Sequence, residues 1–329
     1  MQDTTGRRTL TQTLLAVPAL ISARPLLAAA PWPSRPLRVI VGFPPGQSMD
    51  VLPRAMAEAM SRRIGQPVVI ENRAGGVGVP AVEALIRSVP DGHTLAVGVP
   101  STLVVNPVLM PNLSYAPTRD VVPVARLFDV AVVVSVHAAV PVRTPAEFVA
   151  WLRANPGTRY ASAGPATSPH LAAELFARRL GLSMEHVAYR GSAGALADVA
   201  AGVVPVMFDS APPTLAVLPT GRIRLVAVTA PARLYLLPDT PTVAESLIPG
   251  FEAAGWAGLV APRGTPTTVT EAINVAVRGA LEDTGVGERF AALGAVPRPG
   301  TSAEFDAFIG SEREKWGDVL RTARIRLDG

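Results

Sequence analysis

The stretch Leu37-Arg-Val-Ile-Val-Gly-Phe-Pro-Pro-Gly-Gln-Ser-Met-Asp50 decides the fold. Its apolar run Leu37–Val41 predicts a short strand, and Phe43-Pro-Pro-Gly46 predicts a turn directly after that strand. From Asp50 to Ile64 the apolar residues recur at helical spacing, and Gly65 follows as the expected helix end. Strand, turn and helix in this order form the repeating unit of α/β proteins.

The same unit recurs further along the chain. Pro67–Glu71 and Thr94–Val99 predict two more strands, with a helix between them at Val79–Ser88. Repeated strand–helix units indicate a mainly parallel sheet that is covered by helices on both faces. The long β-branched run Val121–Val136 has no helix beside it, so we expect this run to pass from one lobe to another.

A second strand–helix series follows and predicts a second α/β lobe. Its expected parts are a strand at Tyr160 leading to a loop at Gly164, helices at Pro169–Leu180 and Ala193–Ala201, and strands at Glu185–Tyr189, Val203–Phe208 and Arg224–Thr229. We expect Phe251–Val260 to cross back, and helices at Pro266–Leu293 and Ser302–Ala323 to close the chain.

The predicted fold class is therefore α/β, with two Rossmann-like lobes joined by two crossing strands. Lobe 1 is expected to comprise residues 31–130 and 252–329, and lobe 2 residues 131–251. Open α/β sheets bind ligands at the carboxyl ends of their strands, so the cleft between the lobes is the expected binding site.

Composition excludes several classes of function. The 329 residues include no cysteine, which rules out disulfides, thiolate metal sites and cysteine nucleophiles. The four histidines show no metal-ligand spacing, so no metal is expected. The glycine-rich segment Asn72–Gly78 matches no nucleotide-binding motif, and no cofactor is expected. The net charge of +4 comes without a basic run interleaved with aromatics, which argues against nucleic-acid binding.

Residues 1–30 have the order of a secretory signal peptide. Arg7 and Arg8 give a positive start, Leu14–Ile21 is a short apolar stretch, and small residues at Ala28–Ala30 follow. The paired arginines partly match a twin-arginine signal, so export by either the Sec or the Tat route is expected. The later chain contains no apolar run of membrane-spanning length.

Two loops at predicted helix starts carry the candidate binding residues. In the first, Gly46 permits close backbone approach and Ser48 can donate to a carboxylate, while Asp50 is expected mainly to cap the helix. In the second, Thr167 and Ser168 can hold another acid group, and Ser168 with Pro169 predicts a helix cap and first position.

Three further side chains follow predicted strands of the second lobe. Tyr189 offers a flat wall and a hydroxyl, and Arg190 is either a counter-ion or solvated. Asp209 can either read an amino group of a ligand or cap the next helix.

Ser168 and His170 are the best candidates for a nucleophile and its base. They lie two apart at a helix start, so their side chains are expected to diverge. A third orienting residue and a nucleophile elbow are also missing from the sequence. The prediction is a binding protein and not an enzyme, with a serine hydrolase as the disfavoured alternative.

Read together, these stretches closely resemble the Bug-type receptors, which are the periplasmic solute-binding proteins of tripartite tricarboxylate transporters. The resemblance covers the chain after residue 33. It is carried by the segments Pro36–Gly46 with Asp50, Gly65–Arg73, Pro90–Thr94, Asn106–Pro107, Ser162–Gly164, Thr167–Ser168, His170–Leu171, Tyr189–Ser192, Met207–Asp209 and Leu237–Ser246.

This resemblance implies a two-lobed type II periplasmic binding protein fold in the periplasm, which delivers its ligand to membrane transporter subunits. The ligand classes it implies are di- and tricarboxylates, acidic amino acids, aromatic acids and neutral compounds, and we expect a monomer that captures a small organic anion. The implied ligand-binding positions are Phe43, Gly46, Gln47, Ser48, Asp50, Ser101, Thr102, Ala163, Gly164, Thr167, Ser168, Tyr189 and Asp209.

Three residues depart from the family pattern. Gln47 stands where the family usually has glycine, Arg190 where it has lysine, and Ser210 where it has asparagine. The Gln47 side chain hinders backbone approach, and its amide can touch the ligand instead. A sensory role, in which the closed form is presented to a receptor kinase, stays open beside transport because both use the same cleft.

Overall fold

The computed structural model describes residue 2 and residues 32–322 of the chain. The predicted signal peptide at residues 1–30 lies, apart from Gln2, outside the described residues. In the part that the structure describes, no helix combines the length and the apolar character needed to cross a membrane.

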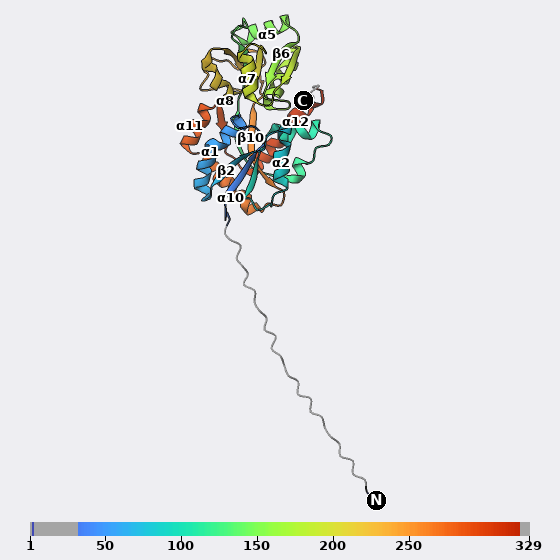
Figure 1. Ribbon diagram of the computed structural model, residues 1–329, viewed down its shortest axis with the longest axis vertical. Coiled ribbons are helices and arrows are strands. Elements are labelled where there is room, and N and C mark those ends of the chain that lie inside the picture. Colours follow the sequence, from blue (N-terminus) through green and yellow to red (C-terminus); the bar gives the residue numbers. More distant parts are fainter. Residues whose placement is uncertain (1, 3–31, 323–329) are drawn as a thin grey trace. The chain divides into compact units, whose positions relative to one another are not determined.

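The described chain contains two mixed β-sheets (Figure 1). The six-stranded sheet has the order β11-β4-β10-β3-β1-β2, and the five-stranded sheet has the order β7-β6-β8-β5-β9. The strands are β1 (Leu37–Val41), β2 (Val68–Asn72), β3 (Thr94–Gly98), β4 (Val121–Val130), β5 (Val132–His137), β6 (Thr158–Ser162), β7 (Met184–Ala188), β8 (Val206–Ser210), β9 (Ile223–Val228), β10 (Gly255–Pro262) and β11 (Ala295–Pro297).

The prediction of mainly parallel sheets is wrong. β1 pairs in parallel with β2 and β3, and β6 pairs in parallel with β7 and β8. β10, however, is antiparallel to both β3 and β4, and β5 is antiparallel to both β8 and β9. β5 brings the chain into the second sheet and β10 brings it back to the first. Each of these two crossing strands is therefore antiparallel to both of its neighbours.

The predicted passage between the sheets at Val121–Val136 is confirmed. This run consists of β4 in one sheet and β5 in the other, with Ala131 between them. The second crossing differs from the expectation for Phe251–Val260, because β10 begins only at Gly255 and lies wholly in the six-stranded sheet. Residues 251–254 cross without strand structure. The predicted lobe boundaries stay a prediction.

Helices cover both faces of each sheet. Helices α1, α10 and α11 share one buried apolar cluster with the six-stranded sheet, and α2 and α12 belong to the cluster on its other face. The longer helices are α1 (Ser48–Ile64), α2 (Val79–Ile86), α5 (Pro145–Ala154), α6 (Ser168–Leu180), α7 (Ser192–Ala200), α8 (Ala211–Val217), α10 (Thr267–Leu281), α11 (Thr284–Ala292) and α12 (Ser302–Thr322). Short helical turns are η1 (Gly76–Gly78), the π-helix Ser101–Val105, α3 (Asn106–Leu109), α4 (Pro117–Asp120), η3 (Leu218–Thr220) and α9 (Val243–Ser246).

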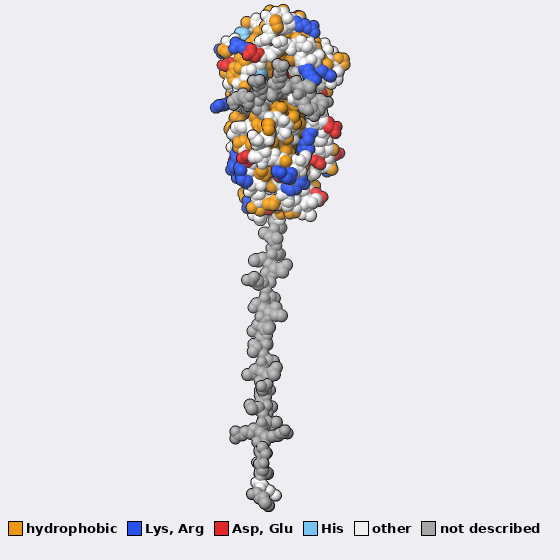
Figure 2. Space-filling model, turned by 90° about the vertical axis from the view of Figure 1, so that its right-hand side faces the viewer, with side chains coloured by type: hydrophobic (Ala, Val, Ile, Leu, Met, Phe, Trp, Pro, Cys, Tyr) orange, Lys and Arg blue, Asp and Glu red, His pale blue; other side chains and the backbone are white. Residues whose placement is uncertain are grey.

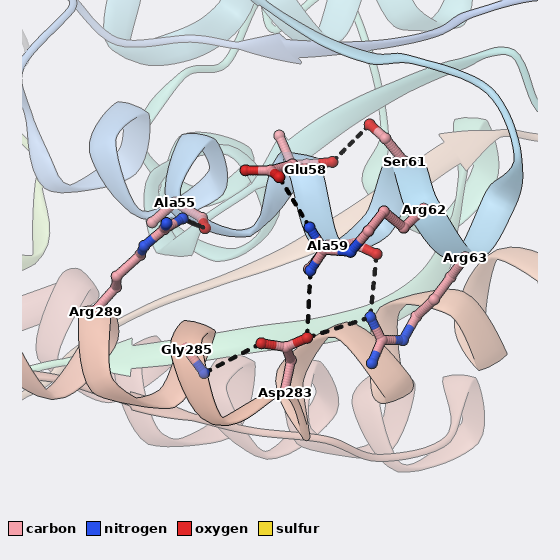
Figure 3. A network of polar contacts seen from close by, with 10 residues as sticks. Ala55, Glu58, Ala59, Ser61, Arg62, Arg63, Asp283, Gly285 and Arg289 are labelled. Carbon is pink, nitrogen blue, oxygen red and sulfur yellow. Dashed lines mark hydrogen bonds and ion pairs between the residues drawn. The ribbon is translucent and has the colours of Figure 1, made fainter.

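The single helix predicted at Pro266–Leu293 is wrong, since α10 ends before α11 begins. Asp283 caps α11 by accepting a hydrogen bond from the Gly285 N–H at 3.1 Å. Its carboxylate also pairs with Arg62 at 3.4 Å and Arg63 at 3.7 Å, both from the last turn of α1 (Figure 3). The helix is broken where its capping residue meets the basic end of α1.

Candidate functional site

Five strand-to-helix junctions converge on one central cavity. They follow β1 and β3 in the six-stranded sheet, and β6, β7 and β8 in the five-stranded sheet. The cavity contains about 420 Å³ of space between atoms, partly open to solvent. It is lined by Phe43, Gln47, Ser48, Met49, Val99, Pro100, Ser101, Ala163, Thr167, Ser168, Pro169, Ser192 and Ser210. None of these lining residues is charged.

The helices that begin at this cavity have no side-chain caps. The N-cap residues of α1, α6, α7 and α8 are Gln47, Thr167, Gly191 and Ser210, and none of their side chains accepts a bond from its helix. By contrast, α5 and α11, which begin elsewhere, are capped by Thr144 and Asp283. The starts of α1, α6 and α7 therefore leave N–H groups and the positive ends of helix dipoles for an anionic ligand. The start of α8 leaves no such donor, because the Ala211 N–H bonds Ala131 O and Pro212 and Pro213 have no N–H.

Ser101 adds a hydroxyl that no protein group satisfies. Its side chain is buried, lines the cavity, and its Oγ has no hydrogen-bond partner among the described residues. A buried hydroxyl without a partner costs free energy, so such groups in native proteins usually meet water or a ligand. Ser101 therefore points to a polar ligand group on the side of the six-stranded sheet.

Asp50 organises the first loop from behind the cavity. Its carboxylate accepts hydrogen bonds from the Gly46 N–H at 2.9 Å, from Arg54 Nε at 2.8 Å and from Asn72 Nδ2 at 2.8 Å. The expectation that Asp50 is the helix cap is wrong, because Gln47 holds that position and α1 starts at Ser48. Asp50 lies in the first turn, where its side chain turns back onto the loop.

Two stacked histidines hold the loop after β6. The rings of His170 and His186 lie 3.9 Å apart and nearly parallel. His170 Nδ1 accepts the N–H of Ala166 at 3.0 Å, and His186 Nε2 lies 2.7 Å from Ser162 Oγ. Burial lowers the pKa of His170 to about 3, with a contribution from His186, and burial lowers the pKa of His186 to about 4. Both rings are therefore neutral at pH 7, as the bond from Ala166 requires.

These contacts remove the basis for a catalytic pair. His170 uses Nδ1 for the loop, and its Nε2 lies 3.8 Å from Glu174. Ser168 is the first residue of α6, with Thr167 as the N-cap, so the predicted cap is one residue too late. A Cβ placed on Gly255 would lie 3.3 Å from Ser168 Oγ, which puts this hydroxyl beside the second crossing.

Asp209 lies behind the cavity wall. Its side chain is fully buried, and Oδ1 accepts hydrogen bonds from Ser192 Oγ at 3.0 Å and from the Ser210 N–H at 2.8 Å. Oδ2 has no partner among the described residues. Burial raises the pKa of Asp209 to about 7, and the two hydrogen bonds only partly oppose this effect. Asp209 therefore positions Ser192 and Ser210, both of which line the cavity.

Two larger spaces flank the central cavity, and both are open to solvent. One contains about 1230 Å³ and is lined partly by Gly164, Tyr189 and Arg190. The other contains about 1570 Å³ and is lined partly by Gly46 and Arg190. The Tyr189 hydroxyl donates a hydrogen bond to Asp198 Oδ2 at 2.6 Å. Burial together with this bond raises the pKa of Tyr189 to about 12.

The predicted positions thus fall into three groups. Those that line the central cavity are Phe43, Gln47, Ser48, Ser101, Ala163, Thr167 and Ser168. Those that line only a flanking space are Gly46, Gly164 and Tyr189. Those that line neither are Asp50, Thr102 and Asp209, of which Thr102 bonds the backbone of Val99.

Sequence reasoning did not assign Met49, Val99, Pro100, Pro169 and Ser192 to the site, although they line the cavity. Ser210 also lines it, and the sequence singled it out only as a departure from the family pattern. Each adjoins a predicted junction, so extending every candidate loop by one or two residues would have found them.

Within the described residues, no group of His, Asp and Glu side chains is arranged to hold a metal ion. On the face drawn in Figure 2, basic and acidic side chains are scattered among hydrophobic and uncharged ones.

Residues 52–325 match the family model described as tripartite tricarboxylate transporter family receptor. Among curated relatives, Protein BugT of Bordetella pertussis is 34% identical over 303 residues, which cover 92% of this chain and 93% of BugT.

Solved structures share the fold. A structure of a periplasmic transporter is 35% identical, with a TM-score of 0.84 over 90% of this chain and all of that one. The R. palustris protein Rpa4515 with adipate is 32% identical, with a TM-score of 0.84 over 88% of this chain and 98% of that one. MatC from Rhodopseudomonas palustris with bound malate is 32% identical, with a TM-score of 0.80 over 88% of this chain and 100% of that one.

Proposed function

This chain belongs to the tripartite tricarboxylate transporter receptor family, and on that premise we propose that it captures a small organic carboxylate in the central cavity. The family consists of receptors that bind a transported substrate, so the chain is a receptor and not an enzyme. Delivery to the membrane subunits of a tripartite transporter is the proposed consequence of capture.

The observation that carries this proposal is the chemistry of the cavity wall. Uncapped starts of α1 and α6 reach it from the two sheets, together with the hydroxyls of Ser48 and Ser101. The lining includes no cation, so neutral donors and helix dipoles would hold the anion. A carboxylate gains charge-assisted hydrogen bonds from such donors.

A dicarboxylate is the proposed ligand class. The donors lie beside both sheets, so one acid group can meet the starts of α1 and the π-helix while the other meets the starts of α6 and α7. Relatives solved with adipate and with malate support this choice.

The proposed location is the periplasm, where the chain would act as a monomer. The charged, apolar and small-residue order of residues 1–30 supports export, and a related structure is that of a periplasmic transporter. Whether export uses the Sec or the Tat route can be read from accumulation of precursor in hosts that lack one of these pathways.

Calorimetry on the chain purified from a periplasmic extract tests the proposal. Titration with malate, succinate and adipate is expected to give saturable binding to at least one of them. Ser101→Ala should weaken that binding about tenfold or more, because a hydroxyl bond to a charged group is worth about 1.5–3 kcal/mol. Ser311→Ala is the control, since that exposed hydroxyl bonds Phe308 O and lines none of the three spaces. Silence across the whole panel would contradict the proposal.

A further inference from the structure

Gln47 occupies a position shared by all three spaces of the cleft. It is 9% exposed, it is the N-cap of α1, and it lines the central cavity and both flanking spaces. Phe43 lines the central cavity and one flanking space, whereas Pro44 lines only the two flanking spaces. Gln47 therefore stands at the boundary between the small inner space and the larger outer ones.

The Gln47 side chain reaches the loop that opens α7. A Cβ built on Gly191 would lie 2.5 Å from Gln47 Nε2, which is closer than real Cβ contacts allow. Gly191 also has a φ of +126°, a backbone conformation that residues with a side chain rarely adopt. The amide of Gln47 thus occupies the place where a side chain on residue 191 would lie. It reaches from the start of α1, beside the six-stranded sheet, to the start of α7, beside the five-stranded sheet.

We propose that Gln47 is a specificity-determining residue that limits the length of the ligand. This inference rests on the proposed function. The inner space is the smallest of the three, with about 420 Å³ against about 1230 and 1570 Å³ for the spaces beyond Gln47, and all three volumes include open solvent. With Gln47 in place, a ligand held at the helix starts is confined to the smallest space, which favours a short dicarboxylate. Without it, a longer chain can extend into the apolar flanking space beside Phe43 and Tyr189.

Two simpler roles for Gln47 make different predictions. If its amide only bonds the ligand, removal weakens every dicarboxylate and any side chain without an amide has the same effect. If its contact with Gly191 only stabilises the closed form, removal weakens all ligands by one common factor. A length limit instead changes the ratio of affinities between long and short ligands.

The test is calorimetric titration of wild type, Gln47→Ala and Gln47→Met with linear saturated dicarboxylates from malonate to azelate. In Gln47→Ala the affinity ratio of long to short ligands should rise about tenfold or more, because burying two further methylene groups favours binding by about that factor. Gln47→Met keeps the length of the side chain without its amide, so it should keep the wild-type preference. Thermal unfolding shows that each variant is folded.

Each outcome bears on one claim. A wild type that binds short dicarboxylates, with an unchanged length profile in Gln47→Ala, overturns the inference and leaves the proposed function standing. A shifted profile in both variants also overturns it, since the amide and not the bulk would then decide. A wild type that binds no member of the series overturns the proposed function, and the length limit with it.

Discussion

Asn72 Nδ2 donates a hydrogen bond to Asp50 Oδ1 at 2.8 Å, and the same amide lies 3.0 Å from the carbonyl oxygen of Phe43. The end of β2 is thereby joined to the loop between β1 and α1. Because Phe43 and Gln47 line the cavity while Asp50 does not, the shape of this part of the site depends on bonds made behind it.

Asp50→Ala should therefore destabilise the protein and weaken ligand binding together. The substitution leaves the Gly46 N–H without its acceptor and removes one of the two acceptors of the Asn72 amide, so the free energy of unfolding should fall by about 3 kcal/mol. Urea denaturation measures this loss. Glu58→Ala is the matched control, because it breaks the exposed pair with Arg62 and should cost less than about 1 kcal/mol. Equal losses in the two variants would contradict the assigned role.

The free energy of unfolding of Asp209→Asn, taken relative to that of wild type, should be greater at high pH than at low pH. The folded pKa of about 7 lies above the usual value of 3.8, so the folded state holds this proton more tightly than the unfolded chain. Ionisation of Asp209 therefore costs stability as the pH rises from about 4 to about 7, and the penalty persists above that range.

Urea denaturation of wild type and Asp209→Asn at pH 5 and pH 8 tests this sign. The stability of the variant relative to wild type should be greater at pH 8 by about 2 kcal/mol. Ser192 and Ser210 can still donate to the amide oxygen, which keeps the local bonds comparable. A difference that does not change with pH would show that Asp209 is already ionised in the folded protein at pH 5.

Local sequence signals predicted the strand–turn–helix units because these depend on neighbouring residues. The runs at β1, β3 and β6 and the loops after them are where the periodicity places them, within a few residues. Parallel strands that neighbour each other end at the same edge of their sheet. Loops such as those at Ser48 and Ser101 could therefore be assigned to one site from the order of strands and helices in the sequence.

What the sequence did not reveal depends on residues far apart in the chain. The break between α10 and α11 involves Asp283 and the basic end of α1, whose residues lie more than 200 positions earlier. β5 and β10 each lie inside a sheet between two other strands, antiparallel to both, and local patterns do not encode that placement. For Asp50 and Asp209, sequence indicates a polar residue at a junction but not the direction in which its side chain points.

The stacked histidines predict a loss of stability in acid. Because their folded pKa values of about 3 and about 4 lie below the usual value of 6.5, the unfolded chain takes up protons that the folded protein does not. Their contribution to stability is therefore complete above about pH 6.5 and declines as the pH falls toward 4.

His186→Phe removes one of these groups and keeps an aromatic ring beside His170. Since Asp209 acts in the opposite direction over the same pH range, the comparison is best made in the Asp209→Asn background. Between pH 7 and pH 5 the fall in unfolding free energy should be smaller by about 2 kcal/mol in His186→Phe. Chemical denaturation at the two pH values measures it, and parallel pH dependences in the two proteins would refute the assignment.

Thr229 ties together the two segments that cross between the sheets. Its side chain is fully buried, and Oγ1 lies 2.7 Å from Ala253 O and 3.0 Å from Val132 O. Its backbone also donates to Val132 O at 2.9 Å and accepts from the Ala253 N–H at 3.1 Å. Val132 follows the first crossing and Ala253 lies within the second, so one residue at the end of β9 sets the distance between them.

Thr229→Val keeps the branched shape and removes only the hydroxyl. The Ala253 carbonyl then loses this donor in a buried place, so the free energy of unfolding should fall by about 1–3 kcal/mol. Thr220→Val is the matched control, because that exposed hydroxyl also bonds a carbonyl oxygen but its loss should change stability by about 0.5 kcal/mol or less. Urea denaturation of both variants gives the comparison. If Thr229→Val costs no more than Thr220→Val, the backbone bonds alone hold the two crossings together, and the hydroxyl has no part in joining them.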